Sequence, residues 1–130
     1  MSIVVAYSPD VYGRAALEHG ARLAQAEDEQ LVLVNATKGE SYVDKRYATE
    51  DDVAELVGQW TAAGVRVDVR RDLVSDVAEA VLAAVEETSA RLVVVGVRRR
   101  TPVGKALLGS VAQRLILDAE CPVLAVKPAR

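Results

Sequence analysis

The stretch that decides the fold is LVVVGVRRRTPVGKALLGS, residues 92–110. Its first four residues are apolar and end at Gly96, a pattern typical of a strand buried on both faces of a parallel sheet. Gly109 and Ser110 then begin a helix, and the free N–H groups at a helix start favour an anion. The loop between them contains no acid and four bases, Arg98, Arg99, Arg100 and Lys105. The stretch therefore predicts a phosphate-binding corner.

Further strands are predicted on both sides of this corner. Apolar runs indicate buried strands at residues 3–6, 31–34 and 123–126. Residues 65–70 alternate valine with charged side chains, which indicates a half-exposed strand at a sheet edge. Residues 35–49 form the longest polar segment, and we expect a loop there.

Helices alternate with these strands. Helical spacing of apolar residues predicts helices at residues 14–27, 50–63 and 77–85, and a fourth that begins at Gly109. Gly64 suits a left-handed cap at the end of the second helix. Ser75 or Asp76 would cap the third helix, because either side chain can accept a hydrogen bond from a free N–H group.

This alternation predicts the fold class α/β, with residues 1–130 forming one domain. We expect a single doubly wound, Rossmann-like, five-stranded parallel sheet with helices on both faces. Right-handed crossovers and an edge position for the third strand favour the order 3-2-1-4-5. Ligands of such sheets bind at the carboxyl ends of the first and fourth strands. Here those ends carry Tyr7, Ser8 and Pro9, and Val95 and Gly96.

Composition excludes several classes of protein. The single cysteine, Cys121, rules out an internal disulfide and a cysteine-rich metal site, and it fits a reducing compartment. No apolar run approaches the roughly 20 residues that a membrane span needs, and Met1 leads directly into a strand without a basic leader. We therefore expect a cytoplasmic protein that does not associate with a membrane.

Charge is distributed unevenly along the chain. The net charge is -3, yet residues 91–130 contain eight of the sixteen lysines and arginines and only two acids, Asp118 and Glu120. A basic segment can bind nucleic acid, but no aromatic residues are interleaved with these bases and no nucleic-acid-binding motif is present. We expect no nucleic acid partner. The run from Arg98 to Arg100 is either a solvated loop or an electrostatic lid over a phosphate.

Two phosphate-handling motifs are absent. A Walker loop needs a glycine five residues before its Gly-Lys pair, whereas Arg99 stands five residues before Gly104. Lys127-Pro128 after the last strand is reminiscent of a phosphoryl receiver domain. Such a domain needs an acid pair after the first strand and an acceptor aspartate after the third, and the only candidates are Asp10 and Asp72.

Catalytic and metal-binding sets are not indicated either. His19 is the single histidine, and it lies within a predicted helix at no metal-ligand spacing. It also lies away from the strand ends, so no Ser-His-acid set forms there. We expect no catalytic residues and no metal site, and therefore a protein that is not an enzyme, with slow ATP hydrolysis at most.

The last strand indicates a homodimer. Its residues Val123, Leu124, Ala125 and Val126 are apolar on both faces, although the predicted order places them at a sheet edge. An exposed apolar edge is prone to aggregation, and the same strand of a second copy covers it most simply. Cover by helices and by the C-terminal tail is the alternative.

The chain resembles the universal stress protein family. Gly96-x2-Arg99-x9-Gly109-Ser110 is similar to the family's glycine-x2-glycine-x9-glycine-serine motif. Residues 107–114 look like the opening of the family's fourth helix, and residues 119–126 look like its closing strand. The resemblance covers the whole chain and implies a five-stranded α/β domain, usually dimeric through the last strand. Many members bind ATP or another adenine nucleotide.

The resemblance also implies a set of binding residues. Around the phosphates and ribose it places Val95, Gly96, Arg99, Gly109, Ser110 and Val111. It places Asn35 and Ala36 near the adenine, with Ser8 and Pro9 at the end of the first strand. Glycine at positions 96 and 109 would let the backbone approach a ligand oxygen closely.

Two departures from the family pattern leave two functions open. Arg99 replaces the second glycine of the motif, and Ser8 replaces a common aspartate at the end of the first strand. Gly96, Gly109 and Ser110 favour a cytoplasmic homodimer that binds ATP, with Mg²⁺, as a stress-response sensor. Ser8 and Arg99 favour a nucleotide-independent dimer that acts in stress tolerance or protein interaction, through an unidentified protein partner.

Overall fold

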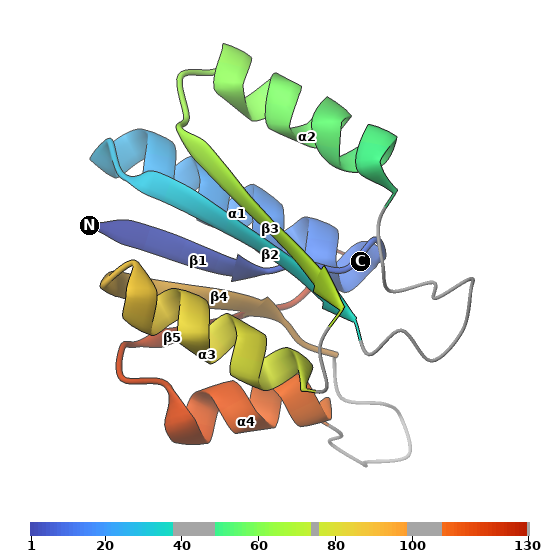
Figure 1. The fold of residues 1–130 in the computed structure, drawn as a ribbon, viewed down its shortest axis with the longest axis vertical. Coiled ribbons are helices and arrows are strands. Elements are labelled where there is room, and N and C mark those ends of the chain that lie inside the picture. The colour runs from blue at the N-terminus through green and yellow to red at the C-terminus, as the bar shows by residue number, and fades with distance from the viewer. Residues whose placement is uncertain (38–48, 74–75, 99–107, 130) are drawn as a thin grey trace.

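The computed structural model describes residues 1–37, 49–73, 76–98 and 108–129, and in these ranges strands and helices alternate (Figure 1). In chain order the elements are β1 (Ser2–Ala6), α1 (Val11–Glu27), β2 (Gln30–Thr37), α2 (Glu50–Ala62), β3 (Val67–Leu73), α3 (Val77–Glu87), β4 (Ala90–Gly96), α4 (Ser110–Asp118) and β5 (Val123–Val126). None of the helices in these ranges combines the length and apolar character needed to cross a bilayer.

The strands form one parallel sheet in the order β3-β2-β1-β4-β5, which confirms the predicted doubly wound α/β fold. β1 is central, and its Val4 pairs in register with Val32 of β2 and Val93 of β4. The chain therefore places β2 and β3 on one side of β1, and β4 and β5 on the other, so the order in which strands are added reverses between β1 and β4. This reversal leaves a crevice at the carboxyl ends of those two strands.

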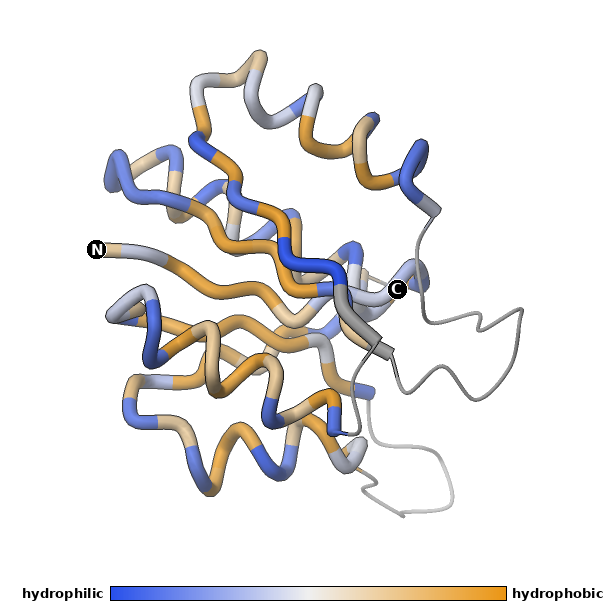
Figure 2. The backbone as a smooth tube through the Cα atoms, viewed as in Figure 1, coloured by the Kyte–Doolittle hydropathy of each residue, from blue (hydrophilic) through white to orange (hydrophobic). Residues whose placement is uncertain are grey.

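Helices cover both faces of the sheet (Figure 1). Side chains alternate between the faces of β1, so Ile3 and Val5 pack with α1 and α2, whereas Val4 packs with α3 and α4. The middle stretches of the three central strands are accordingly hydrophobic (Figure 2). Burial on both faces explains why these strands appear in the sequence as continuous apolar runs.

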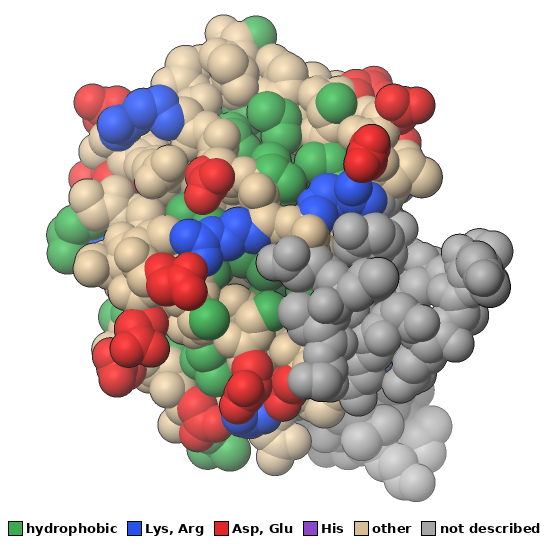
Figure 3. Space-filling view, in the orientation of Figure 1, with side chains coloured by type: hydrophobic (Ala, Val, Ile, Leu, Met, Phe, Trp, Pro, Cys, Tyr) green, Lys and Arg blue, Asp and Glu red, His purple; other side chains and the backbone are tan. Residues whose placement is uncertain are grey.

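β3 occupies a sheet edge, as its alternating sequence predicts. Its first residue is Val67 rather than Val65. Arg70 forms an ion pair with Glu87 of α3, and Arg71 lies 3.6 Å from Glu50 of α2. Acidic and basic side chains are interspersed on this face of the molecule (Figure 3). Charged side chains of β3 therefore form ion pairs at the edge of the sheet.

Two element boundaries differ from the sequence prediction. β2 continues to Thr37, so Asn35 and Ala36 belong to a strand and the prediction of a loop from residue 35 is wrong there. Asn35 is tolerated because its fully buried side chain donates a hydrogen bond to the Tyr7 carbonyl at 3.0 Å. α1 begins at Val11 rather than at residue 14, because Asp10 caps it.

Other helix ends follow the prediction closely. Gly64 has φ +92° and directly follows the cap of α2. Asp76 caps α3, accepting a hydrogen bond from the Glu79 N–H at 3.2 Å. The other candidate cap, Ser75, lies outside the described residues.

Packing of α4 against the sheet can be tested with two leucines of the same helix. Leu115 is 0% exposed and Leu117 is 73% exposed. Leu115→Ala should lower the free energy of unfolding by about 2–5 kcal/mol, because it leaves a cavity in the core. Leu117→Ala should change it by less than about 0.5 kcal/mol. Urea denaturation at one protein concentration measures both, and equal losses would contradict the packing described.

Candidate functional site

A cavity of about 250 Å³ lies at the carboxyl ends of β1, β2 and β4. The start of α1 and the starts of α3 and α4 complete its walls. Its apolar lining residues include Val34, Val77, Val81, Val95 and Val111. The cavity therefore occupies the crevice that the strand order predicts.

Most of the residues expected at a binding site line this cavity. They are Ser8, Ala36, Val95, Gly96, Gly109, Ser110 and Val111. Pro9 and Asn35 are not among the lining residues, and the Asn35 side chain is fully buried. Arg99 lies outside the described residues, as do Arg100 and Lys105. The structure thus brings four separate segments of the predicted site together.

Several lining residues were not expected from the sequence. They are Tyr12 and Gly13 of α1, Val34 of β2, Val77 and Val81 of α3, and Ala112 of α4. Tyr12 and Gly13 were missed because the start of α1 was placed too late. Asp10, a favourable N-cap residue three positions before Gly13, was the available signal.

The start of α1 packs directly against the ends of β1 and β4. A Cβ atom on Gly13 would lie 1.9 Å from the Ser8 carbonyl oxygen, and one on Gly96 would lie 2.2 Å from the Tyr12 carbonyl oxygen. Both glycines are therefore required by contacts between backbones within the protein. For Gly96 this differs from the expected reason, which was close approach to a ligand oxygen.

Gly109 has a different environment. Among the described residues, apart from its chain neighbours, no heavy atom lies within 4 Å of the position that its Cβ would take, and its φ is -59°. Neither packing nor an unusual backbone conformation explains a glycine here. The absence of a side chain instead leaves the entrance to the first turn of α4 open.

The first turn of α4 carries hydrogen-bond donors that the helix itself does not use. Gly109 is its N-cap and makes no side-chain capping hydrogen bond. The Gly109 carbonyl accepts from the Gln113 N–H at 3.0 Å, so the helix ladder begins there. The N–H groups of Ser110, Val111 and Ala112 precede that first bond and have no partner within the helix. They line the cavity and favour an acceptor or an anion.

The opposite side of the cavity carries an acceptor. The Ser8 hydroxyl donates to Asp10 Oδ1 at 3.0 Å, and the same oxygen accepts from the N–H groups of Tyr12 and Gly13. Asp10 therefore caps α1 and does not line the cavity. Because the hydroxyl hydrogen of Ser8 is engaged, its oxygen retains lone pairs that can accept a hydrogen bond, and Ser8 lines the cavity.

Two tyrosines lie at the site, Tyr12 on its wall and Tyr7 with its side chain packed in the core on the α1 and α2 side. Tyr7 is only 6% exposed, and this burial raises the pKa of its phenol against the opposing influence of Arg14. Its hydroxyl is therefore neutral at physiological pH. The Tyr12 ring has the Arg98 guanidinium 5.8 Å from its centroid, so one positive charge is held beside a lining residue.

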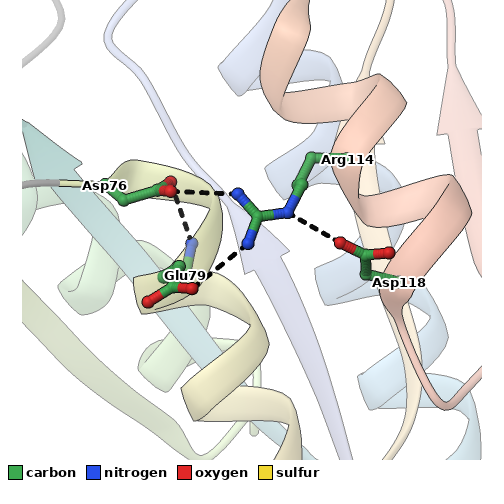
Figure 4. Close-up of polar contacts among 4 residues, drawn as sticks. All are labelled: Asp76, Glu79, Arg114 and Asp118. Atoms are coloured by element: carbon green, nitrogen blue, oxygen red, sulfur yellow. Dashed lines mark hydrogen bonds and ion pairs between the residues drawn. The ribbon is translucent and has the colours of Figure 1, made fainter.

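An arginine midway along α4 contacts the start of α3 (Figure 4). Arg114 Nη1 lies 2.9 Å from Asp76, and Nη2 lies 3.1 Å from Glu79, both at the start of α3. Arg114 Nε lies 2.7 Å from Asp118, one turn further along α4. Hydrogen bonding to Arg114 is the main reason that the pKa of Asp76 lies below its ordinary value.

Metal-binding groups are sparse in the described ranges. No three side chains of His, Cys, Asp or Glu gather there in the way that a metal site needs. His19 is exposed on α1, away from the cavity. Among the described lining residues, those with a polar side chain outside the two cores are Ser8, Tyr12 and Ser110.

The fold is shared with solved universal stress proteins. A structure from Archaeoglobus fulgidus superposes with a TM-score of 0.74 at 21% identity, covering 97% of each chain. A second from this organism, in complex with dAMP, gives 0.67 at 19% identity, over 97% of this chain and 96% of that one. A universal stress protein in complex with cAMP gives 0.69 at 21% identity, over 99% and 98%.

Sequence comparison gives the same family at higher identity. The chain is 48% identical over 126 residues to a universal stress protein of Mycolicibacterium smegmatis, covering 97% of each. It is 31% identical over 134 residues to one from Thermus aquaticus, covering 97% of this chain and 98% of that protein. The family model described as "Universal stress protein family" matches residues 1–127. The chain therefore belongs to the universal stress protein family.

Proposed function

We propose that this protein binds an adenine nucleotide, ATP with Mg²⁺, in the cavity at the ends of β1 and β4 and acts as a stress-response sensor. The observation that carries this proposal is the uncapped start of α4, which faces an apolar cavity. Three N–H groups of that turn have no partner within the helix. An anion at this point also gains from the helix dipole.

The two parts of a nucleotide suit the two parts of the cavity. Valine side chains from β2, β4, α3 and α4 offer apolar surface to a base. The open entrance at Gly109 leaves room for a phosphate beside the free N–H groups of α4. The volume of about 250 Å³ is slightly below the range of roughly 300–1,000 Å³ typical of small-molecule sites, so the outer phosphates would extend through the entrance.

Two family members support the choice of ligand. Their solved structures are complexes with dAMP and with cAMP, and both share the fold of this chain over nearly its whole length. Both ligands combine an adenine base with a phosphate. This is the combination that the apolar walls and the α4 start would accommodate here.

Binding is proposed in preference to catalysis. The polar side chains lining the cavity in the described ranges carry hydroxyl groups, with no histidine, carboxylate or lysine among them to act as a general base. Burial raises the pKa of the Tyr7 phenol, which packs in the core on the α1 side and does not activate a water molecule at the cavity. We further propose that the protein acts in the cytoplasm, where its one thiol, Cys121, stays reduced.

Titration calorimetry with ATP and Mg²⁺ tests the binding site. The ligand-free protein should bind with micromolar affinity, and Gly109→Val should weaken binding by at least about tenfold, because a branched side chain would fill the entrance. Gly58→Val is the matched control, since Gly58 also has no heavy atom within 4 Å of its Cβ position but lies on α2. Equal affinities of the two variants for ATP would show that the nucleotide does not bind at the proposed site.

We also propose a homodimer through β5. β5 is an edge strand that pairs with β4 on one side, so its other backbone edge is available to a second copy. Its side chains are apolar, and Ala125 is exposed whereas Leu124 packs against the core on the α1 side. Val123 packs against the core on the α3 and α4 side, and Val126 is buried in the core on the α1 side. A substitution at Ala125 therefore tests the dimer interface without disturbing either core.

Ala125→Glu should convert the dimer to a monomer without unfolding it, because two like charges would meet at the shared edge while neither core is disturbed. Gln59→Glu adds the same charge at an exposed position of α2, far from β5, and this variant should remain a dimer. Sedimentation velocity measures both variants, with circular dichroism as a check of folding. A dimeric Ala125→Glu protein would show that β5 is not the interface.

A nucleotide-independent dimer that binds a partner protein is the second candidate. The pairing of Ser8 with Asp10 favours it, because no carboxylate lines the cavity in the part of the chain that the structure describes. So do Ile116 and Leu117, which are exposed on α4. Absence of heat up to millimolar ATP, with an unchanged Tm, would select this candidate.

A further inference from the structure

Resting on the proposed nucleotide site, we infer that Arg114 is a positioning residue: it fixes the start of α4 against the start of α3 and so sets nucleotide affinity. Arg114 does not line the cavity. It contacts Asp76, the residue that caps α3 and directly precedes the lining residue Val77. It projects from α4 one turn after Ser110, which also lines the cavity.

The geometry of the guanidinium group suits this role. Its three nitrogens each bond to a different carboxylate, and two of those carboxylates, Asp76 and Glu79, belong to the neighbouring helix (Figure 4). A planar group held in three directions fixes both the separation and the rotation of the helices it joins. The remaining α3–α4 contacts are apolar, through residues such as Val81, Ala112 and Leu115. Apolar contacts have little directional preference.

The Arg114 network contributes little to the global stability of the protein. All four side chains of the network are partly exposed to solvent. Ion pairs in such positions contribute little to the free energy of folding. The position of the donors at the α4 start matters more, because the strength of a hydrogen bond to a ligand falls steeply with distance and angle. Loss of the link should thus appear in ligand affinity before it appears in stability.

A purely electrostatic role predicts the opposite response to one substitution. Asp76→Asn removes a negative charge near the proposed phosphate position, and this alone would tighten binding of an anion. The same substitution weakens the link to Arg114, and the positioning role then predicts weaker binding. Asparagine is as good an N-cap as aspartate, so α3 should remain capped. The sign of the change in affinity therefore distinguishes the two roles.

The experiment is calorimetric titration with ATP and Mg²⁺ of the unchanged protein and four variants: Asp76→Asn, Arg114→Gln, the double variant, and Asp118→Asn as control. Asp118 bonds the same guanidinium from within α4 and does not join the helices. We expect the two single variants of the interhelical link to raise Kd by about three- to tenfold, and the double variant to match Arg114→Gln. Asp118→Asn should change Kd by less than about twofold.

Three results would overturn the inference. Tighter binding by Asp76→Asn would show a charge effect, and equal Kd changes for Asp76→Asn and Asp118→Asn would show no dependence on the interhelical link. An unchanged Kd with a lowered Tm in Arg114→Gln would show a structural role only. These three leave the nucleotide site itself standing. Absence of ATP binding by the unchanged protein would instead refute the proposed function and this inference together.

Discussion

The rest of this structure depends on the contact between the start of α1 and the ends of β1 and β4. Backbone meets backbone there with no room for a side chain, at Gly13 against Ser8 and at Gly96 against Tyr12. This contact brings the two central strand ends and the first turn of α1 into one wall. The cavity forms beside it because the chain reverses direction across the sheet at the same point.

The other wall is formed by two helices whose starts meet above the sheet. α3 contributes Val77 and Val81, and α4 contributes its free N–H groups. The apolar core under these helices holds them on the sheet, whereas Arg114, one turn into α4, supplies a directional contact to the start of α3. Packing thus creates the cavity, and polar contacts set the orientation of the groups that would meet a phosphate.

The fold could be predicted almost entirely from the sequence, because burial on both sheet faces gives continuous apolar runs and an edge strand gives alternation. The site could be predicted in part. Gly96 and Ser110 were found from the corner motif, whereas Val77 and Val81 reach the cavity only through the packing of α3 on the sheet. The buried Asn35 looked like a loop residue because its hydrogen bond to the Tyr7 carbonyl spans 28 residues of sequence. A local sequence pattern does not reveal a contact between residues so far apart in the chain.

The central claim is that the first turn of α4 receives the phosphate of an adenine nucleotide. The most direct measurement is a titration of ¹⁵N-labelled protein with ATP and Mg²⁺, followed by the amide resonances of the backbone. The account predicts that the amides of Ser110, Val111 and Ala112 shift most, together with those of Gly13 and Gly96 at the opposite wall. Shifts confined to other surfaces, or none at saturating nucleotide, would contradict it.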